Sequence, residues 1–185
     1  MTVETRNGPT GPGLSPDEGM LSDVSFTQRQ LDVLRCLAEG LNEQGIAESV
    51  RRSYSSVSSQ KEEITEIITQ RIVRHPLYVE IPDKFINKLA LAVAISVGNG
   101  YIDAHNLSAG PSEPLTGREE NILKLMIMGI NYEGISELLC ISKDKVTMDV
   151  DGISRKTDSY GRARRYKLVA WGVGYFKQQA APPPV

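Results

Sequence analysis

Two blocks of the chain carry the same pattern of hydrophobic and polar positions. Residues 26–64 align without a gap on residues 115–153, at an offset of 89 (115 minus 26), and 11 of these 39 positions are identical. Average residue usage would give roughly two or three identities by chance. The pattern therefore predicts an internal duplication, in which both blocks fold into the same short elements.

Each block begins with a predicted helix that starts at a capping box and ends at a glycine. A Thr followed three residues later by Gln or Glu satisfies free backbone N–H groups at a helix start, and apolar residues follow at helical spacing. Glycine supplies the left-handed backbone that ends many helices. The capping pairs are Thr27 with Gln30 and Thr116 with Glu119, and the closing glycines are Gly40 and Gly129.

The rest of each block predicts a second, short helix capped by Asn and a third helix capped by Ser. The caps are Asn42 and Ser53 in the first block, and Asn131 and Ser142 in the second. Along the third helices we expect the inward-facing side chains to be Val57, Ile64 and Ile67, and Val146, Val150 and Ile153. Two short helices joined by a tight turn form a helix-turn-helix.

A fourth helical stretch of small and apolar residues follows each block, from Asp83 and from Arg162. Ala94 and Gly98 correspond to Ala170 and Gly174, which are 76 residues further on, so the first copy has 13 extra residues (89 minus 76) before this helix. Pro76 and Pro82 forbid one continuous helix across the insertion.

The predicted fold is all-α, with two tandem four-helix modules at residues 25–98 and 115–177. The connecting residues 99–114 have turn composition, which predicts a linker that leaves the modules some relative freedom. Residues 1–24 are rich in Gly, Pro, Ser and acidic side chains and predict a disordered acidic tail. Residues 178–185 predict a second disordered tail.

Composition narrows the function. The net charge is -2 and the pI about 5.8, which excludes a uniformly basic nucleic-acid coat. No apolar run reaches the 18 or so residues that a membrane span needs, and no signal pattern is present, so we expect a cytoplasmic protein without membrane contact. Cys36 and Cys140 are expected to be reduced, buried thiols. His75 and His105 are far apart in the sequence and no catalytic constellation is found, so we expect no enzyme activity, metal or cofactor.

Three motifs recur at matching positions. The second block contains "LTGREENILKL", "ISELL" and "SKDKV", and the first contains "FTQRQLDVLRCLAEGL", "IAESV" and "SYSSV". They resemble the C-terminal, GerE-like DNA-binding domain of bacterial LuxR-type transcription regulators, here present as two tandem copies. The resemblance implies a helix-turn-helix fold and double-stranded DNA as the partner. It covers no sensor domain.

In that family the third helix enters the major groove of DNA. Carried over by position, the base-reading residues would be Ser55, Ser58, Ser59 and Lys61 in copy one, and Lys143, Lys145, Thr147 and Met148 in copy two. This chain departs from the family's basic pair and His, which are replaced by "SSQ" from Ser58 and "TMD" from Thr147. Carboxylates follow in both copies and would repel phosphates unless they face away. The family's turn glycine is replaced by Arg51 and Cys140, so the turn geometry could differ.

Neither helix-turn-helix is basic by itself. Residues 26–70 hold five basic and seven acidic side chains, and residues 113–158 hold six and nine. The basic residues that we expect to contact phosphates are Arg51, Arg52, Arg71, Arg74, Arg162, Arg164, Arg165 and Lys167. The alternative for these charges is a solvated helix face.

The leading hypothesis is a sequence-specific, nucleoid-associated transcription regulator in which two linked modules imitate a dimer. Linking two weak readers raises the apparent affinity through effective concentration. Copy two keeps the Leu-Thr-x-Arg-Glu start and two lysines, and is the better candidate for base reading. The alternative is a degenerate helix-turn-helix protein, similar to region four of sigma factors, that binds RNA polymerase or another regulator. A homodimer through the last helix, where Trp171 and Tyr175 are four residues apart, is a further expectation.

Overall fold

The computed structural model describes residues 23–103, 110–161 and 163–181. These ranges are helical, with one isolated antiparallel bridge between Ile86 and Ile130. The elements are α1 (Gln28–Ala38), α2 (Glu43–Ser49), α3 (Tyr54–Ile72), α4 (Pro76–Val79), the 3₁₀ turn η1 (Asp83–Phe85), α5 (Lys88–Gly98), α6 (Gly117–Ile127), α7 (Tyr132–Leu139), α8 (Lys143–Lys156) and α9 (Arg164–Ala180). The all-α prediction is confirmed for the described residues.

The predicted caps begin the helices of both copies. Thr27 and Thr116 each close a capping box with the side chain three residues on. The side chains that cap the second and third helices accept backbone N–H groups at 2.9–3.2 Å, and they are those of Asn42, Ser53, Asn131 and Ser142. The helix starts are therefore encoded locally, by short polar side chains that satisfy free N–H groups.

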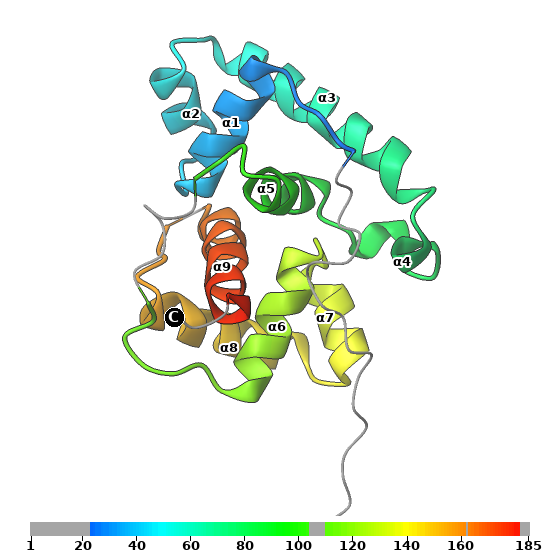
Figure 1. The fold of residues 1–185 in the computed structure, drawn as a ribbon, viewed down its shortest axis with the longest axis vertical. Helices are drawn as coiled ribbons and strands as arrows, with labels where there is room; N and C mark the ends of the chain where they lie inside the picture. The colour runs from blue at the N-terminus through cyan, green and yellow to red at the C-terminus, as the bar shows by residue number, and fades with distance from the viewer. Residues whose placement is uncertain (1–22, 104–109, 162, 182–185) are drawn as a thin grey trace, which may run out of the picture.

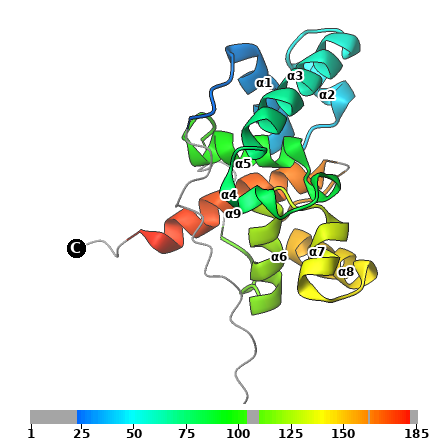
Figure 2. The same cartoon turned by 90° about the vertical axis from the view of Figure 1, so that its right-hand side faces the viewer.

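The two copies pack around one shared core. In Figure 1, α1–α3 lie at the top and α6–α8 at the bottom, and α5 and α9 cross between them. The side view in Figure 2 gives the same order. The contact between α5 and α9 is the most extensive between described helices, and the residues buried on both sides belong to one continuous hydrophobic cluster. The described residues of the two copies therefore form one packed body; residues 104–109 of the expected linker lie outside the described residues.

The insertion in copy one forms the bridge between the copies. Figure 2 places α4 beside the lower half of the molecule. The Tyr78 hydroxyl of α4 donates to the Met128 carbonyl at 3.2 Å. The Asn131 amide N–H donates to the Phe85 carbonyl at 2.7 Å, and the Asn87 amide N–H donates to the Gly129 carbonyl at 2.6 Å. These bonds fasten the stretch before α5 to the turn between α6 and α7.

Three expected boundaries need correction. Val24 is buried and Asp23 pairs with Arg71, so order begins before residue 25, whereas residues 1–22 lie outside the described residues. Helix α9 continues to Ala180, into the predicted second tail, of which residues 182–185 lie outside the described residues. The fourth helix of copy one begins at Lys88 rather than Asp83, because the Asn87 side chain caps it.

One predicted core position is also wrong. Ile68 of α3 is fully buried, whereas Ile67 is only partly buried. At about 100° per residue, Ile68 lies about 20° from the direction of Val57 and Ile67 about 80° from it. The buried stripe of α3 is therefore Val57, Ile64, Ile68 and Ile72.

Candidate nucleic-acid interface

Both helix-turn-helix turns keep a left-handed residue although glycine is absent. Arg51 and Cys140 each have φ of +52°, and Cys140 is exposed rather than buried as expected. The Arg52 N–H donates to the Ala47 carbonyl at 3.0 Å, and the Ile141 N–H donates to the Ser136 carbonyl at 3.1 Å. This bonding ends α2 and α7 in the same way, so the two turns match despite a cost of about 1–2 kcal/mol for a residue with a Cβ in this conformation.

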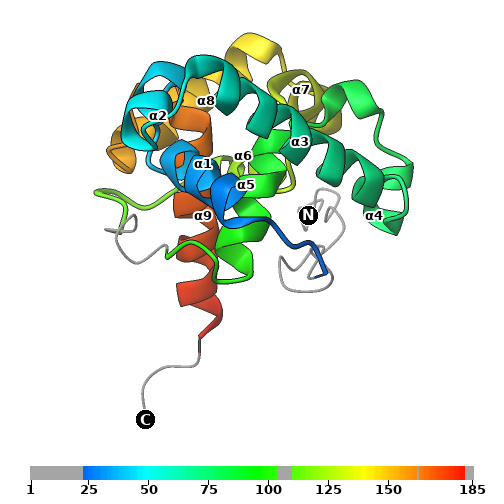
Figure 3. The ribbon, with the colours of Figure 1, turned by 90° about the horizontal axis from the view of Figure 1, so that it is seen from above.

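The two helix-turn-helix units lie on the same side of the molecule. Figure 3 places α2, α3, α7 and α8 along one side, and the C-terminal end of α9 projects from the opposite side. The first turns of α3 and α8 begin at this face, directly after the turns at Arg51 and Cys140. We call this side the helix-turn-helix face.

At the start of α8, two of the four predicted base-reading side chains are fully available. Lys143 is exposed, and Met148 has 64% of its surface exposed although it is apolar. The Lys145 ammonium lies 3.1 Å from the Asp149 carboxylate, and the Thr147 hydroxyl donates to the Lys143 carbonyl at 3.0 Å. Lys143 and Met148 are therefore the side chains of α8 best placed to reach another molecule.

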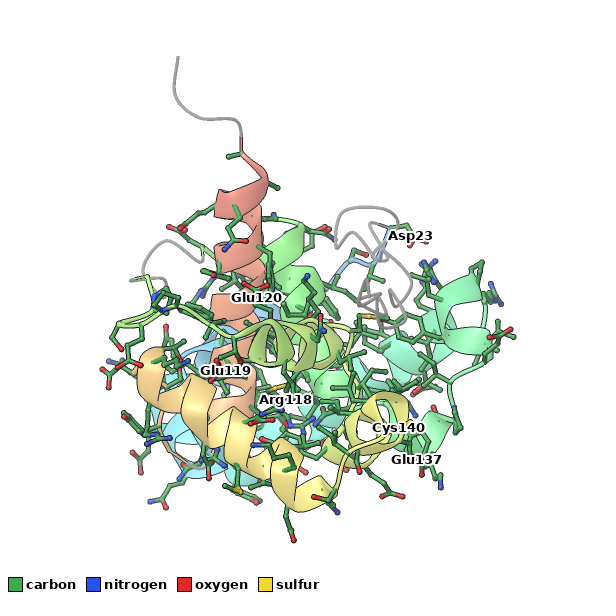
Figure 4. The ribbon with its side chains drawn as sticks, turned by 90° about the horizontal axis from the view of Figure 1, so that it is seen from below. Asp23, Arg118, Glu119, Glu120, Glu137 and Cys140 are labelled. Carbon is green, nitrogen blue, oxygen red and sulfur yellow. The ribbon has the colours of Figure 1, made fainter. Side chains whose placement is uncertain are left out.

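Asp149, which the sequence left as an obstacle to DNA, is buried and paired. Arg118 of α6 donates to both of its oxygens, at 2.7 and 3.2 Å, and only 9% of the Asp149 side chain is exposed. Figure 4 places Arg118 between α6 and α8. Burial alone would raise the pKa of Asp149, but the hydrogen bonds from Arg118 and Lys145 outweigh it and hold the pKa below its usual value. Asp149 thus fixes α8 against α6 and presents no free charge.

In copy one the corresponding helix start is polar and uncharged. Ser55 and Ser59 are exposed and Ser58 is partly buried. Lys61 is held by Glu43 of α2, which also accepts a hydrogen bond from the Tyr54 hydroxyl, and these two bonds lower the pKa of Glu43. The serines can form hydrogen bonds with a partner, but Lys61 is already paired.

The predicted phosphate-contacting residues divide into two groups. Arg51, Arg52 and Arg74 are exposed, and within the described ranges they form no ion pair. The others, apart from Arg165, form intramolecular contacts at the surface or lie outside the described residues: Arg71 pairs with Asp23, Arg164 pairs with Asp151, Lys167 donates to the Asp158 carbonyl, and Arg162 is not described.

Arg165 is unsuited to the predicted phosphate contact. Its guanidinium stacks over the Tyr132 ring, 4.2 Å from the centroid. Burial lowers the pKa of Arg165, and one of its terminal nitrogens is buried without a hydrogen-bond partner. The side chain therefore anchors α9 to α7 inside the protein.

Sequence reasoning missed Arg29, at the start of α1. It lines a pocket between α1 and α3, whose polar lining also includes Asp32, Arg52, Ser56 and Gln60. In copy two the equivalent of Arg29 is Arg118 and that of Gln60 is Asp149, each 89 residues further on. Because copy one has an amide in place of the carboxylate, Arg29 forms no ion pair of the kind that holds Arg118. The repeat alignment could have revealed this difference.

The part of the chain that the structure describes also bears on metal binding and on membrane insertion. No group of three or more His, Cys, Asp or Glu residues could hold a metal ion there. No described helix is both long and apolar enough to span a membrane. No protein-family model, no curated protein and no solved structure matches this chain.

Proposed function

We propose that the protein is a sequence-specific DNA-binding transcription regulator that uses its two LuxR-like helix-turn-helix units. One observation carries this proposal: the exposed starts of α3 and α8 lie on the same side of one packed body. A helix fits the major groove of DNA, and side chains near its start reach the base edges. Two such helices on one face can meet the same side of a duplex.

The side chains on the helix-turn-helix face have the chemistry that this contact requires. An exposed lysine such as Lys143 can donate to the O6 and N7 acceptors of guanine, and an apolar side chain such as Met148 can contact a thymine methyl group. In copy one, Ser55 and Ser59 can form hydrogen bonds with either the donors or the acceptors of the bases, and the neighbouring Arg52 can neutralise a phosphate. Copy two therefore has the better base reader, and copy one contributes more through the backbone.

The net negative charge of the chain does not count strongly against DNA binding, because two carboxylates of α8 are paired within the protein. Asp149 is buried against Arg118, and Asp151 pairs with Arg164 at 2.6 Å, so neither opposes a phosphate as a free charge. Arg51, Arg52 and Lys143 remain exposed beside the two helix starts, together with the exposed carboxylate of Asp144. Because electrostatic contact with DNA depends on charges within a Debye length, these local cations matter more than the total of the chain.

A genomic capture tests the function. The purified protein is incubated with sheared host DNA at about physiological salt, and the retained fragments are sequenced. We expect an enriched motif, and binding to that motif that weakens steeply with salt. Lys143→Ala should lower the affinity, whereas the control Gln178→Ala, at the exposed C-terminal end of α9 that projects to the opposite side, should not. No enrichment by a folded, helical sample would refute the proposal.

A second candidate function rests on the outer face of α3. Glu62, Glu63 and Glu66 are exposed there, beyond the first two turns. Carboxylates on a helix repel phosphates but suit a basic protein surface, which favours a partner such as RNA polymerase or another regulator. A pull-down with polymerase, comparing the protein with a Glu62→Gln, Glu66→Gln variant, distinguishes this candidate. Retention that the double variant abolishes, together with an empty genomic capture, would support it.

A further inference from the structure

We infer that one chain, acting alone, occupies a DNA site with two unequal half-sites. The inference rests on the proposed function and goes beyond it, because it fixes the number of chains on the duplex and the symmetry of the DNA sequence. It follows from three features: how the copies exchange contacts, how rigidly they are joined, and how their recognition helices differ.

The copies are packed by a two-fold exchange. The end of α1 at Gly40 lies against Lys167 of α9, where an added Cβ would be 3.5 Å from the Lys167 side chain. The end of α6 at Gly129 lies against Leu91 of α5, where an added Cβ would be 2.9 Å from the Leu91 Cβ. The glycines are 89 residues apart and their partners 76 apart, which are the two offsets of the duplication. Each copy therefore ends its first helix on the fourth helix of the other copy.

This exchange makes the chain equivalent to a dimer. In Figure 1, α1 and α2 at the upper left are matched by α6 and α7 at the lower right, on either side of the crossing α5 and α9. A two-fold dimer contacts two half-sites from one side, and its symmetry matches that of the duplex backbone. The internal two-fold relation places both helix-turn-helix units in that arrangement without a second chain.

The fourth helices, α5 and α9, bury most of their apolar residues in this internal packing. Ala94 and Ile95 of α5, and Ala170 and Trp171 of α9, are almost completely buried. The Trp171 ring stacks on Tyr175 with centroids 4.8 Å apart. Trp171, one of the two residues through which we expected a homodimer, is thus buried within the chain, and Tyr175 is partly buried.

The two units are also held at one separation. The bridge between Ile86 and Ile130 and the bond from the Asn87 N–H to the Gly129 carbonyl join the stretch before α5 to copy two. The Lys177 ammonium donates to the Gly98 carbonyl at 2.5 Å and joins the last helix to copy one. A body joined at several points cannot follow half-sites that are moved apart, unlike two domains on a flexible linker.

The two recognition helices expose different chemistry to those half-sites. The exposed side chains in the first turns of α3 include Ser55 and Ser59, and those of α8 include Lys143 and Met148. Identical half-sites suit identical readers, so unequal readers select a site that is not a palindrome.

The test uses a duplex bearing the motif from the genomic capture. Its complex is weighed by native mass spectrometry, and affinity is measured by fluorescence anisotropy for the original duplex and for duplexes with 5 or 10 base pairs inserted between the half-sites. We expect one chain, adding 20.4 kDa to the duplex. Both insertions should weaken binding about 100-fold or more, because only one unit can then bind. Two chains per site, or tolerance of the 10-base-pair insertion, would overturn the inference and leave the proposed function standing.

A variant provides the second readout. Lys143→Ala should relax base selection in one half-site only, and Ser55→Ala with Ser59→Ala should relax it in the other. If two chains bound symmetrically, each variant would change both half-sites, and the inference would be wrong. A capture that enriches no motif would instead refute the proposed function, and the inference with it.

Discussion

The exchange between the copies can be tested by comparing two glycines that hold equivalent positions in the repeat. Gly40 and Gly129 both follow a first helix and both have a left-handed backbone, with φ of +86° and +79°. Their surroundings differ. A Cβ at Gly40 would meet only the flexible Lys167 side chain, at 3.5 and 3.6 Å. A Cβ at Gly129 would meet the Leu91 Cβ at 2.9 Å and the Asn87 carbonyl oxygen at 3.2 Å.

The magnitudes follow from these contacts. Gly→Ala at either position places a Cβ in the left-handed region, which costs about 1–2 kcal/mol of the free energy of unfolding. At Gly129 the Cβ also collides with the packed start of α5, and overpacking of this kind adds about 1–3 kcal/mol. We therefore expect Gly129→Ala to lose more stability than Gly40→Ala, by about 1–3 kcal/mol.

The assay is urea unfolding followed by far-ultraviolet circular dichroism, with Gly100→Ala as a third variant. Gly100 has φ of +76° and no atom within 4 Å of an added Cβ, so it reports the backbone cost alone. Gly40→Ala and Gly100→Ala should lose similar amounts. Equal losses for Gly40→Ala and Gly129→Ala would refute the packing of α6 against α5, and with it the exchange on which the single-chain complex depends.

The remaining predictions concern the charges around α8 and α1. Lys143→Ala combined with Lys145→Ala should weaken DNA binding more than Ser55→Ala combined with Ser58→Ala. Most of that loss should come from Lys143, because Lys145 is paired with Asp149. Anisotropy titrations of the single and double variants check this, and equal losses for the two pairs would contradict it. Asp149→Asn should destabilise the protein by about 1–3 kcal/mol at pH 7, because hydrogen bonds to a charged group are lost. The folded state lowers the pKa of Asp149, so the stability that this carboxylate contributes to the fold is present above the unfolded pKa of about 3.9 and is lost as the pH falls through the lower folded pKa. The urea midpoints of wild type and variant should therefore converge in acid. A constant difference from pH 7 to pH 3 would contradict the pairing. Arg29→Ala and Arg52→Ala should each reduce the slope of log affinity against log salt by about one unit without changing the selected motif, if the pocket between α1 and α3 holds a phosphate.

The sequence predicted the helices well because their signals are local. Thr27, Asn42 and Ser53 each satisfy an N–H group three residues away, and such a bond depends on little else. Core positions along α3 are harder to predict, because the helix has adjacent isoleucines at positions 67 and 68 and only one of them can face inward. Only the angle accumulated from Val57 distinguishes Ile68 from Ile67, and a helix of 19 residues makes small errors in spacing matter.

Contacts between distant parts of the chain could not be predicted in this way. The packing of Gly129 on Leu91 and the bond from Asn131 to Phe85 depend on how two folded units meet, and no local pattern encodes that. Repeat comparison could have found part of the site. The change from Arg29 and Gln60 to Arg118 and Asp149 is visible in the alignment, and an Arg facing an acidic residue across two helices predicts an ion pair.

The same comparison shows how one duplication yields two helix starts with different charges. In copy two, Asp149 forms ion pairs with both Arg118 and Lys145. These pairs hold α8 against α6 and leave Lys143 without an ion-pair partner among the described residues. In copy one, the amide of Gln60 cannot form such an ion pair with Arg29, whereas Glu43 of α2 forms an ion pair with Lys61. Copy two thus has an exposed cation in the first turn of α8, at Lys143 beside the exposed Asp144, whereas the exposed Arg29, Arg51 and Arg52 of copy one lie before α3. Under the proposed function, bases are reached from the first turn of the helix and phosphates from its flanks, so we expect copy two to contribute more to base reading and copy one more to contact with the DNA backbone.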